Sequence, residues 1–149
     1  MRIEGGGCLD LAPGQITDDS ELAMCLMRGL ISGKGKLDAT HICKNYGLWY
    51  ADGPFDIGLT TKSALKYIDL ENPKPSQARE AAIKWNAKSL SNGSLMRITP
   101  LAVWGQNLSD EDLSKAVKED TTLVHSNPLM SEIISIYCIA IKILIQNCD

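Results

Sequence analysis

The chain has 149 residues, of which 44% are hydrophobic and 22% charged, a composition typical of an ordinary folded domain and unlike that of a disordered chain. Its net charge of −3, the lack of a basic cluster and an aromatic content of only 5% argue against a nucleic-acid partner, which needs positive charge and rings that stack on bases. The length fits a single domain or part of a larger one.

Residues 1–16 predict a loop-like lead, because they contain a run of glycines at residues 5–7 and a Pro-Gly pair at residues 13–14. The start of the chain shows no basic segment followed by an apolar core, so we expect no signal peptide. The five cysteines are odd in number and form no C-x-x-C pair, which is typical of a reducing compartment. We therefore expect a cytoplasmic protein without a disulfide framework.

Helical periodicity begins after this lead. From Leu22, apolar residues recur at i, i+3, i+4 and i+8, which predicts an amphipathic helix that ends at the Gly-Lys-Gly of residues 33–35. Asp18 and Glu21 have the spacing of a capping box at the start of this helix. Acidic residues in a first turn also suit the helix dipole.

Two more helices are predicted in the next forty or so residues. Asp38 can cap the first of them, which ends at the Gly-Pro of residues 53–54. Thr60 or Thr61 can start the other, which the prolines at positions 73 and 75 interrupt. Both segments carry apolar residues at helical spacing, so each is expected to bury one side.

The second half of the chain predicts four more helices. Ser76 can cap the first, and residues 94–104 form the second, which Pro100 kinks or restarts. Ser109 can cap a short third helix. The Asn-Pro pair at residues 127–128 then opens the last helix, with proline at the first helical position.

This last helix is apolar on nearly every side over residues 130–145. It is shorter than the ~20 residues that span a bilayer, and Ser135 and Lys142 interrupt it, so we expect a buried helix and no membrane partner. The other predicted helices offer limited cover, so we expect more chain or a partner to pack there. Since no alternating strand pattern is present, the expected fold is all-α, an orthogonal multi-helix bundle.

Thr17-Asp18-Asp19 places a hydroxyl and two adjacent carboxylates at the start of the first helix. A helix cap with favourable dipole interactions explains these residues without any ligand. Alternatively, they are hard oxygen ligands for Mg²⁺ or Mn²⁺, and the diverging acids reach two ions about 4 Å apart. Three side chains cannot fill two octahedral shells, so such a site needs ligands from elsewhere.

Three other segments have both a structural and a functional interpretation. Asp56 lies in a turn, where it either forms local hydrogen bonds or orients a water or a sugar hydroxyl. Asn92-Gly93 precedes a predicted helix, and the free N–H groups at the start of this helix could bind phosphate or ribose oxygens. The structural alternative is an ordinary helix cap, with Arg97 at the surface. His125 lies in a loop, where a lone histidine is structural or catalytic.

Taken in this order, the four segments resemble the motifs of the ADP-ribosylglycohydrolase family, which includes ADP-ribosylarginine hydrolases and dinitrogenase reductase-activating glycohydrolases. Residues 17–20 resemble its T-D-D-[ST] motif, and residues 53–61 resemble its G-x-x-D-x-G-x-T stretch. Residues 92–102 are similar to its N-G-[AS]-x-M-R…P-L-A segment. Residues 122–128 resemble its T-H-x-x-P motif, with one extra residue between Thr and His.

The resemblance implies an all-α hydrolase with a binuclear Mg²⁺ or Mn²⁺ site in a central cleft. Its implied reaction removes ADP-ribose from modified protein side chains such as arginine, so ADP-ribose or an ADP-ribosylated protein is the implied partner. Of the family's glycine-rich G-x-x-x-G-D-x-x-G stretch, only a short Gly-rich lead remains here. The family's C-terminal D-x-D-[ST], which supplies the remaining metal ligands, has no counterpart after His125. We therefore expect a single partial domain over residues 1–149, with impaired activity on its own.

The resemblance also implies a role for each candidate residue. Thr17, Asp18 and Asp19 would ligate the metals. Asp18, Asp19 and Asp56 would serve catalysis, with Asp56 facing the ribose as a base or an orienting group. The backbone around Asn92, Gly93 and Ser94 is implied to line the ADP-ribose pocket, with Met96 and Arg97 behind it and His125 at the rim.

Two other interpretations remain open at this point. One is a module that binds ADP-ribose or a modified protein without cleaving it, and the other is a helical fragment with no function. Binding without turnover distinguishes the first of these from a hydrolase. Poor cooperativity in thermal unfolding, with dye binding to exposed apolar surface, is the behaviour expected of the second.

Overall fold

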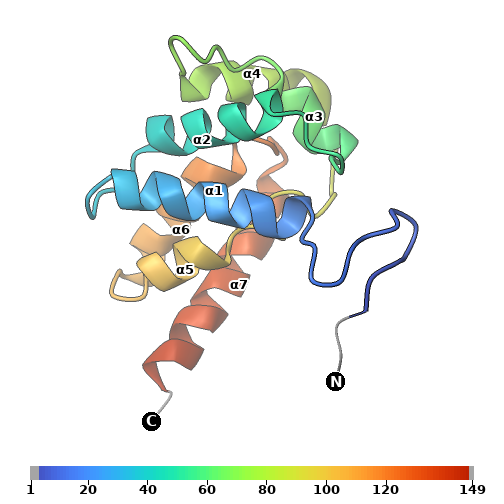
Figure 1. Cartoon of the computed structure of the whole chain (residues 1–149). Coiled ribbons are helices and arrows are strands. Elements are labelled where there is room, and N and C mark those ends of the chain that lie inside the picture. Colours follow the sequence, from blue (N-terminus) through green and yellow to red (C-terminus); the bar gives the residue numbers. More distant parts are fainter. Residues whose placement is uncertain (1–3, 148–149) are drawn as a thin grey trace.

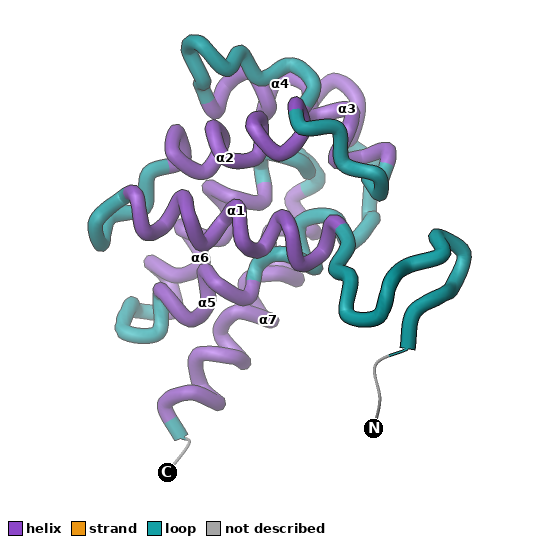
Figure 2. Tube along the Cα trace, in the orientation of Figure 1, coloured by secondary structure: helices purple, strands orange, loops and turns teal. Residues whose placement is uncertain are grey.

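The computed structural model describes residues 4–147, so the first three residues and the last two, Cys148 and Asp149, lie outside the described part. Within that part the chain forms seven α-helices and no strand, which confirms the expected all-α fold (Figures 1 and 2). The helices are α1 (Asp18–Ser32), α2 (Ala39–Ala51), α3 (Leu59–Leu65), α4 (Pro75–Asn86), α5 (Thr99–Trp104), α6 (Asp110–Thr121) and α7 (Pro128–Gln146). The described lead is a loop, as predicted, with Gly6 and Leu11 joined by two backbone hydrogen bonds.

The bundle is arranged around α1 and α2, which pack side by side (Figure 1). α3 and α4 pack against each other beside α2, whereas α5 packs on both α1 and α7. α6 packs along α7, which runs obliquely across the bundle. The α1–α2 contact buries Leu22, Leu26 and Ile42 completely, so the predicted apolar side of the first helix is its core side.

Three of the predicted helix caps are confirmed. The backbone N–H of Thr40 donates to Asp38 Oδ1 at 2.8 Å at the start of α2. The N–H of Asp112 donates to Ser109 Oγ at 3.0 Å at the start of α6. Asn127 caps α7, and Pro128 occupies its first turn. These caps satisfy backbone donors that have no partner inside the helix.

The predicted capping box at the start of α1 is wrong. Thr17 is the N-cap residue, and no side chain there accepts a hydrogen bond from the backbone. Glu21 instead accepts a hydrogen bond from Trp49 Nε1 at 2.7 Å and so ties α1 to α2. The carboxylate of Asp18 is therefore not used to cap the helix.

Two further boundaries differ from the prediction. α4 begins at Pro75 with Lys74 as its N-cap residue, not Ser76, because Gln77 Oε1 accepts the Lys74 N–H at 3.0 Å. Residues 94–97, predicted as the first part of a helix, instead belong to successive turns over residues 92–97, and α5 begins only at Thr99. The proline at the second position of α5 thus starts a helix instead of kinking one.

α7 is not buried on several sides within the described chain, contrary to the prediction. Its buried residues are Met130, Ile134, Cys138 and Lys142, which recur every four residues along one side. Lys142 Nζ donates to Leu108 O at 2.8 Å and to Asp110 Oδ1 at 2.6 Å. By length and composition alone α7 could cross a membrane, but the core helix of a soluble protein meets the same criteria.

We expect Gly29→Ala to destabilise the bundle by about 1–3 kcal/mol, because overpacking a tight contact forces backbone shifts. A Cβ at this position would lie 2.8 Å from Ile42 Cα, in the closest part of the α1–α2 contact. Chemical unfolding monitored by circular dichroism measures the effect. The exposed neighbour Arg28→Ala is the control, with a change below about 0.5 kcal/mol, and equal stabilities for the two variants would contradict the prediction.

Candidate functional site

Three segments that are far apart in the sequence meet around a small hollow of about 90 Å³. Asp18 comes from the start of α1, residues 58–61 come from the start of α3, and residues 91–93 come from the loop between α4 and α5. Met96 completes the lining. The structure therefore brings Asp18 together with the Asn92-Gly93 loop, as the sequence analysis predicted.

Asp18 is the most perturbed carboxyl group at this hollow. Only 8% of the residue is exposed, and its pKa is raised from 3.8 to about 6. Burial is the largest cause of this shift, and the negative charges of Asp56 and then Asp19 add to it. The loop between α2 and α3 thus brings Asp56 close enough to Asp18 for their charges to interact.

The other residues of the predicted metal site lie nearer the surface. Thr17 and Asp56 are half-buried and Asp19 is exposed. Thr17 Oγ1 donates to Asp19 Oδ2 at 3.3 Å. This donor set of carboxylates and a hydroxyl suits a hard divalent cation, and a bound cation would offset the repulsion that raises the pKa of Asp18.

The donor set is nevertheless incomplete as the chain stands. Among residues 4–147, no group of three or more His, Cys, Asp and Glu side chains is arranged to hold a metal ion. Asp18 is buried at the hollow, whereas Asp19 points to the exposed side of the helix start. The metal site therefore stays a prediction, and further ligands would have to come from outside this part of the chain.

The loop at residues 91–93 passes so close to α3 that only glycine fits at position 93. A Cβ at this position would lie 2.8 Å from Thr61 Oγ1 and 3.6 Å from the Cε1 atom of His125. Thr61 is itself almost completely buried, at 1% exposure. Any larger residue at position 93 would push the loop away from the helix start that carries Thr61.

Arg97 does not reach the pocket, contrary to its assignment as a surface or pocket residue. Its side chain is completely buried and forms an ion pair with Asp120, with Nη2 3.0 Å from Oδ2. Arg97 Nε donates to the Tyr46 hydroxyl at 2.8 Å, and Nη1 donates to Gly93 O at 2.8 Å. The Tyr46 hydroxyl in turn donates to Asp120 Oδ1 at 2.7 Å. Arg97 therefore holds the loop from beneath and contacts no solvent.

His125 is also completely buried, behind the loop rather than at the rim of the pocket. Its Nδ1 lies 2.8 Å from Ser94 Oγ, and its Nε2 lies 3.1 Å from Ser91 Oγ. Burial and then the charge of Arg97 lower its pKa to about 4, so the imidazole is neutral near pH 7. His125 and Ser94 therefore fix the loop instead of contacting a ligand in the hollow.

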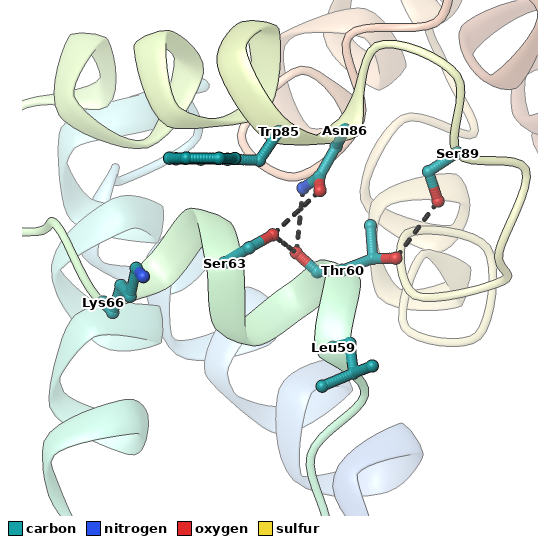
Figure 3. A pocket seen from close by; sticks show the side chains of 7 residues that line it. All are labelled: Leu59, Thr60, Ser63, Lys66, Trp85, Asn86 and Ser89. Carbon is teal, nitrogen blue, oxygen red and sulfur yellow. Dashed lines mark hydrogen bonds between the residues drawn. The ribbon is translucent and has the colours of Figure 1, made fainter.

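A second, larger hollow of about 400 Å³ adjoins the first, and Leu59 and Thr60 line both (Figure 3). The indole of Trp85 lies along one side of it, above Ser63. Asn86 joins its two walls, because Nδ2 donates to Thr60 O at 2.9 Å and Oδ1 accepts from Ser63 Oγ at 2.8 Å. This hollow was not predicted from the sequence, because it depends on the packing of α3 on α4.

The resemblance of the four segments to family motifs can be tested by comparison of the whole sequence with known protein families. The model of the family described as ADP-ribosylglycohydrolase matches residues 2–149. The chain belongs to the ADP-ribosylglycohydrolase family. The resemblance inferred from residues 17–20, 53–61, 92–102 and 122–128 is thereby confirmed.

Individual relatives agree with the family match. The chain is 37% identical over 148 residues to a putative ADP-ribosyl glycohydrolase, L543, of Acanthamoeba polyphaga mimivirus, and the match covers 96% of this chain and 43% of that one. It is 34% identical over 130 residues to an ADP-ribosyl-[dinitrogen reductase] glycohydrolase of Rhodospirillum rubrum, with coverages of 86% and 40%. The chain thus spans less than half the length of these curated relatives.

The fold also has a solved counterpart. A structure described as an ADP-ribosylglycohydrolase-related protein complex matches with a TM-score of 0.74 and 24% sequence identity. The match covers 95% of this chain and 44% of that one. Nearly every helix of the bundle therefore belongs to the family's architecture.

We expect Arg97→Met to lower the free energy of unfolding by about 3–5 kcal/mol, because it leaves the buried carboxylate of Asp120 without its partner. Urea unfolding measures this change. The double variant Arg97→Met/Asp120→Leu should recover much of the loss, since no buried charge then remains. Lys115→Met breaks only exposed pairs, with Glu111 and Asp112, and is the control. A comparable loss in that variant would contradict the assignment.

We expect Asp18→Asn to stabilise the metal-free chain above pH 6. Between about pH 4 and pH 6 the folded carboxyl keeps a proton that the unfolded one loses, so the wild type loses stability as pH rises. With allowance for solvent screening, the variant should be more stable by about 1 kcal/mol at pH 7, and near pH 3.5 the difference should vanish. Unfolding in the presence of a chelator measures it.

His125 titrates in the opposite sense, because its pKa is lowered to about 4. Its contribution rises with pH, but it is common to the wild type and to Asp18→Asn. The difference between the two proteins therefore isolates Asp18. A difference that stays constant across this pH range would show that Asp18 titrates normally.

Proposed function

We propose that this chain carries the ADP-ribose-binding part of a hydrolase that removes ADP-ribose from modified protein side chains, with arginine as the acceptor. The observation that carries the proposal is the convergence of Asp18, the Asn92-Gly93 loop and the start of α3 at one hollow. Family membership supports the reaction class. The name of the Rhodospirillum rubrum relative, which specifies dinitrogen reductase, supports a modified protein as the substrate.

Thr17, Asp18 and Asp19 would hold a divalent cation, Mg²⁺ or Mn²⁺, or the two ions that the resemblance implies. Bound there, such an ion supplies positive charge that positions and acidifies a water and holds ribose hydroxyls. Asp18 has to lose its proton to take part, so its pKa of about 6 makes cation binding weaker in acid. Because Asp18 lines the hollow, its carboxylate would lie close to a sugar bound there.

In the proposed reaction, water oxygen bonds to the anomeric carbon of the ribose, and the bond from that carbon to the acceptor nitrogen breaks. One water proton passes to a carboxylate, for which Asp56 is the candidate, and a proton ends on the departing nitrogen. The sugar becomes cation-like on the way, and the carboxylates of Asp18 and Asp56 favour that charge. Asp56 would also orient the attacking water.

The loop would hold the rest of the nucleotide. Asn92 and Gly93 line the hollow, and their backbone N–H groups would donate to ribose or phosphate oxygens, with Met96 as an apolar neighbour. Arg97, Ser94 and His125 would act as positioning residues, because they hold this loop and do not reach the hollow. The adjoining hollow beside Trp85 gives the nucleotide room to extend.

A non-catalytic ADP-ribose-binding module is the second candidate. The incomplete set of metal ligands in residues 4–147 favours it for the chain on its own. The two candidates share the binding site and differ only in turnover.

We also infer a reducing compartment such as the cytoplasm, since Cys8, Cys25, Cys43 and Cys138 are free thiols.

Calorimetric titration with ADP-ribose in the presence of Mg²⁺ tests the proposal. We expect binding by the wild type, and Asp18→Asn should weaken it at least about tenfold, since it removes a ligand charge of the cation. Asp112→Asn, on the exposed start of α6, is the control and should bind as the wild type does. Equal binding by all three proteins, or none by any, would contradict the proposed site.

Release of ADP-ribose from a modified arginine substrate separates the two candidates. Turnover by the chain alone would support the hydrolase. Binding without turnover would support the binding module. The absence of both would reject each of them for this chain.

A further inference from the structure

The surface formed by α3 and α4 differs in charge from the rest of the chain. Residues 58–93 contain six of the 15 Lys and Arg residues but only three of the 18 Asp and Glu residues, although the net charge of the whole chain is −3. Among the six are two pairs of exposed lysines, Lys62 and Lys66 on α3 and at its end, and Lys84 and Lys88 on α4 and just beyond it. Side chains four residues apart lie on one side of a helix, and α3 packs on α4. The two pairs therefore give this part of the bundle a positive surface.

In the described part of the chain, these four lysines have no carboxylate partner, since the ion pairs among residues 4–147 involve none of them. Two of them lie over aromatic rings instead. Lys66 Nζ is 4.8 Å from the ring centroid of Tyr67, and Lys84 Nζ is 4.8 Å from that of Trp85. Both rings are about half exposed. The residues that we call the α3–α4 surface are Lys62, Lys66, Tyr67, Lys84, Trp85 and Lys88.

The α3–α4 surface is continuous with the candidate site. The small hollow of that site and the larger hollow beside it share part of their lining at the start of α3. The larger hollow is lined in turn by Lys66 and by the indole of Trp85 (Figure 3). Trp85 also lines a third hollow of about 180 Å³, together with Tyr67, Glu80 and Lys84. A polypeptide that reaches the small hollow can therefore also contact the exposed rings and lysines.

We propose that the α3–α4 surface docks an acidic segment of the ADP-ribosylated protein while the ADP-ribose group occupies the hollow at Asp18. This inference rests on the proposed function, because it concerns the protein that carries the nucleotide. Exposed aromatic rings give a partner apolar contact area with little loss of side-chain freedom. Lysines without a carboxylate partner attract the carboxylates of an acidic segment, which speeds encounter and orients the partner.

The charge of the remaining chain favours an acidic protein segment over a nucleic acid. Outside residues 58–93, acidic residues outnumber basic ones by 15 to nine, and two of them begin α1 beside the hollow. An extended polyanion would be repelled beyond the α3–α4 surface, whereas a short acidic segment contacts only the lysines. Lys62 and Lys84 line neither of the two hollows assigned to the nucleotide, so their charge is available to the protein part of the substrate.

The test compares the affinities of the chain for two peptides in the presence of Mg²⁺. Each peptide carries one ADP-ribosylarginine, which is flanked by aspartates in one peptide and by asparagines in the other. We expect the wild type to bind the acidic peptide about fivefold more tightly at low salt, because each exposed ion pair contributes little. High salt should abolish this preference. Lys62→Met/Lys84→Met should remove most of it and leave the affinity for free ADP-ribose unchanged.

Lys36→Met/Lys115→Met is the matched control, because it removes the same charge from exposed positions outside the α3–α4 surface. This variant should keep the preference for the acidic peptide. Circular dichroism melts check that both double variants fold. An equal effect of the two variants, or no preference in the wild type, would overturn the proposal. So would weaker binding of free ADP-ribose by Lys62→Met/Lys84→Met, since the lysines would then serve the nucleotide itself.

An acidic peptide without ADP-ribose separates a failure of this inference from a failure of the proposed function. If the chain binds this peptide through Lys62 and Lys84 but does not bind ADP-ribose, the proposed function is contradicted and the docking surface is supported. If it binds ADP-ribose without any preference for acidic peptides, the docking surface is overturned and the proposed function stands. Tighter binding of a single-stranded oligonucleotide, or of anionic lipid vesicles, through the same lysines would also overturn the docking surface.

Discussion

The buried guanidinium of Arg97 is the interaction on which the site depends. It bonds to Gly93 O from beneath the loop, to Tyr46 of α2 and to Asp120 of α6, so three parts of the bundle meet at one cation. Because Arg97 and Asp120 are both completely buried, neither can lose its partner without a large desolvation cost. The loop is thereby held where Asn92 and Gly93 face Asp18.

The loop lies opposite the carboxyl group of Asp18, whose negative charge is disfavoured by its neighbours. Asp18 is buried beside Asp19 and Asp56, and burial and the neighbouring negative charges raise its pKa to about 6. Such clustering costs stability in the isolated chain, which is a common property of sites that bind cations or catalyse reactions. The Arg97 network thus positions the loop, and Asp18 provides the negative charge at the hollow.

Local signals in the sequence were enough to predict the all-α fold, most helix starts and the segments that form the hollow. The caps at Asp38, Ser109 and Asn127 depend only on neighbouring residues. The burial of Arg97 could not be predicted in this way, because its partners Tyr46 and Asp120 lie 51 and 23 residues away. Residues 94–97 were predicted as helix but form turns, and within these turns Arg97 donates to Gly93 O. The hollow beside Trp85 was missed because it is created by the packing of two helices.

The central claim is that Asp18 and the Asn92-Gly93 loop form one binding site for ADP-ribose. The most direct test is a nuclear magnetic resonance titration of the ¹⁵N-labelled chain with ADP-ribose and Mg²⁺. We expect the amide signals of Asp18, Asn92 and Gly93 to shift together, so that all three give the same affinity for ADP-ribose. Shifts confined to other parts of the bundle, or no shifts at saturating nucleotide, would contradict it.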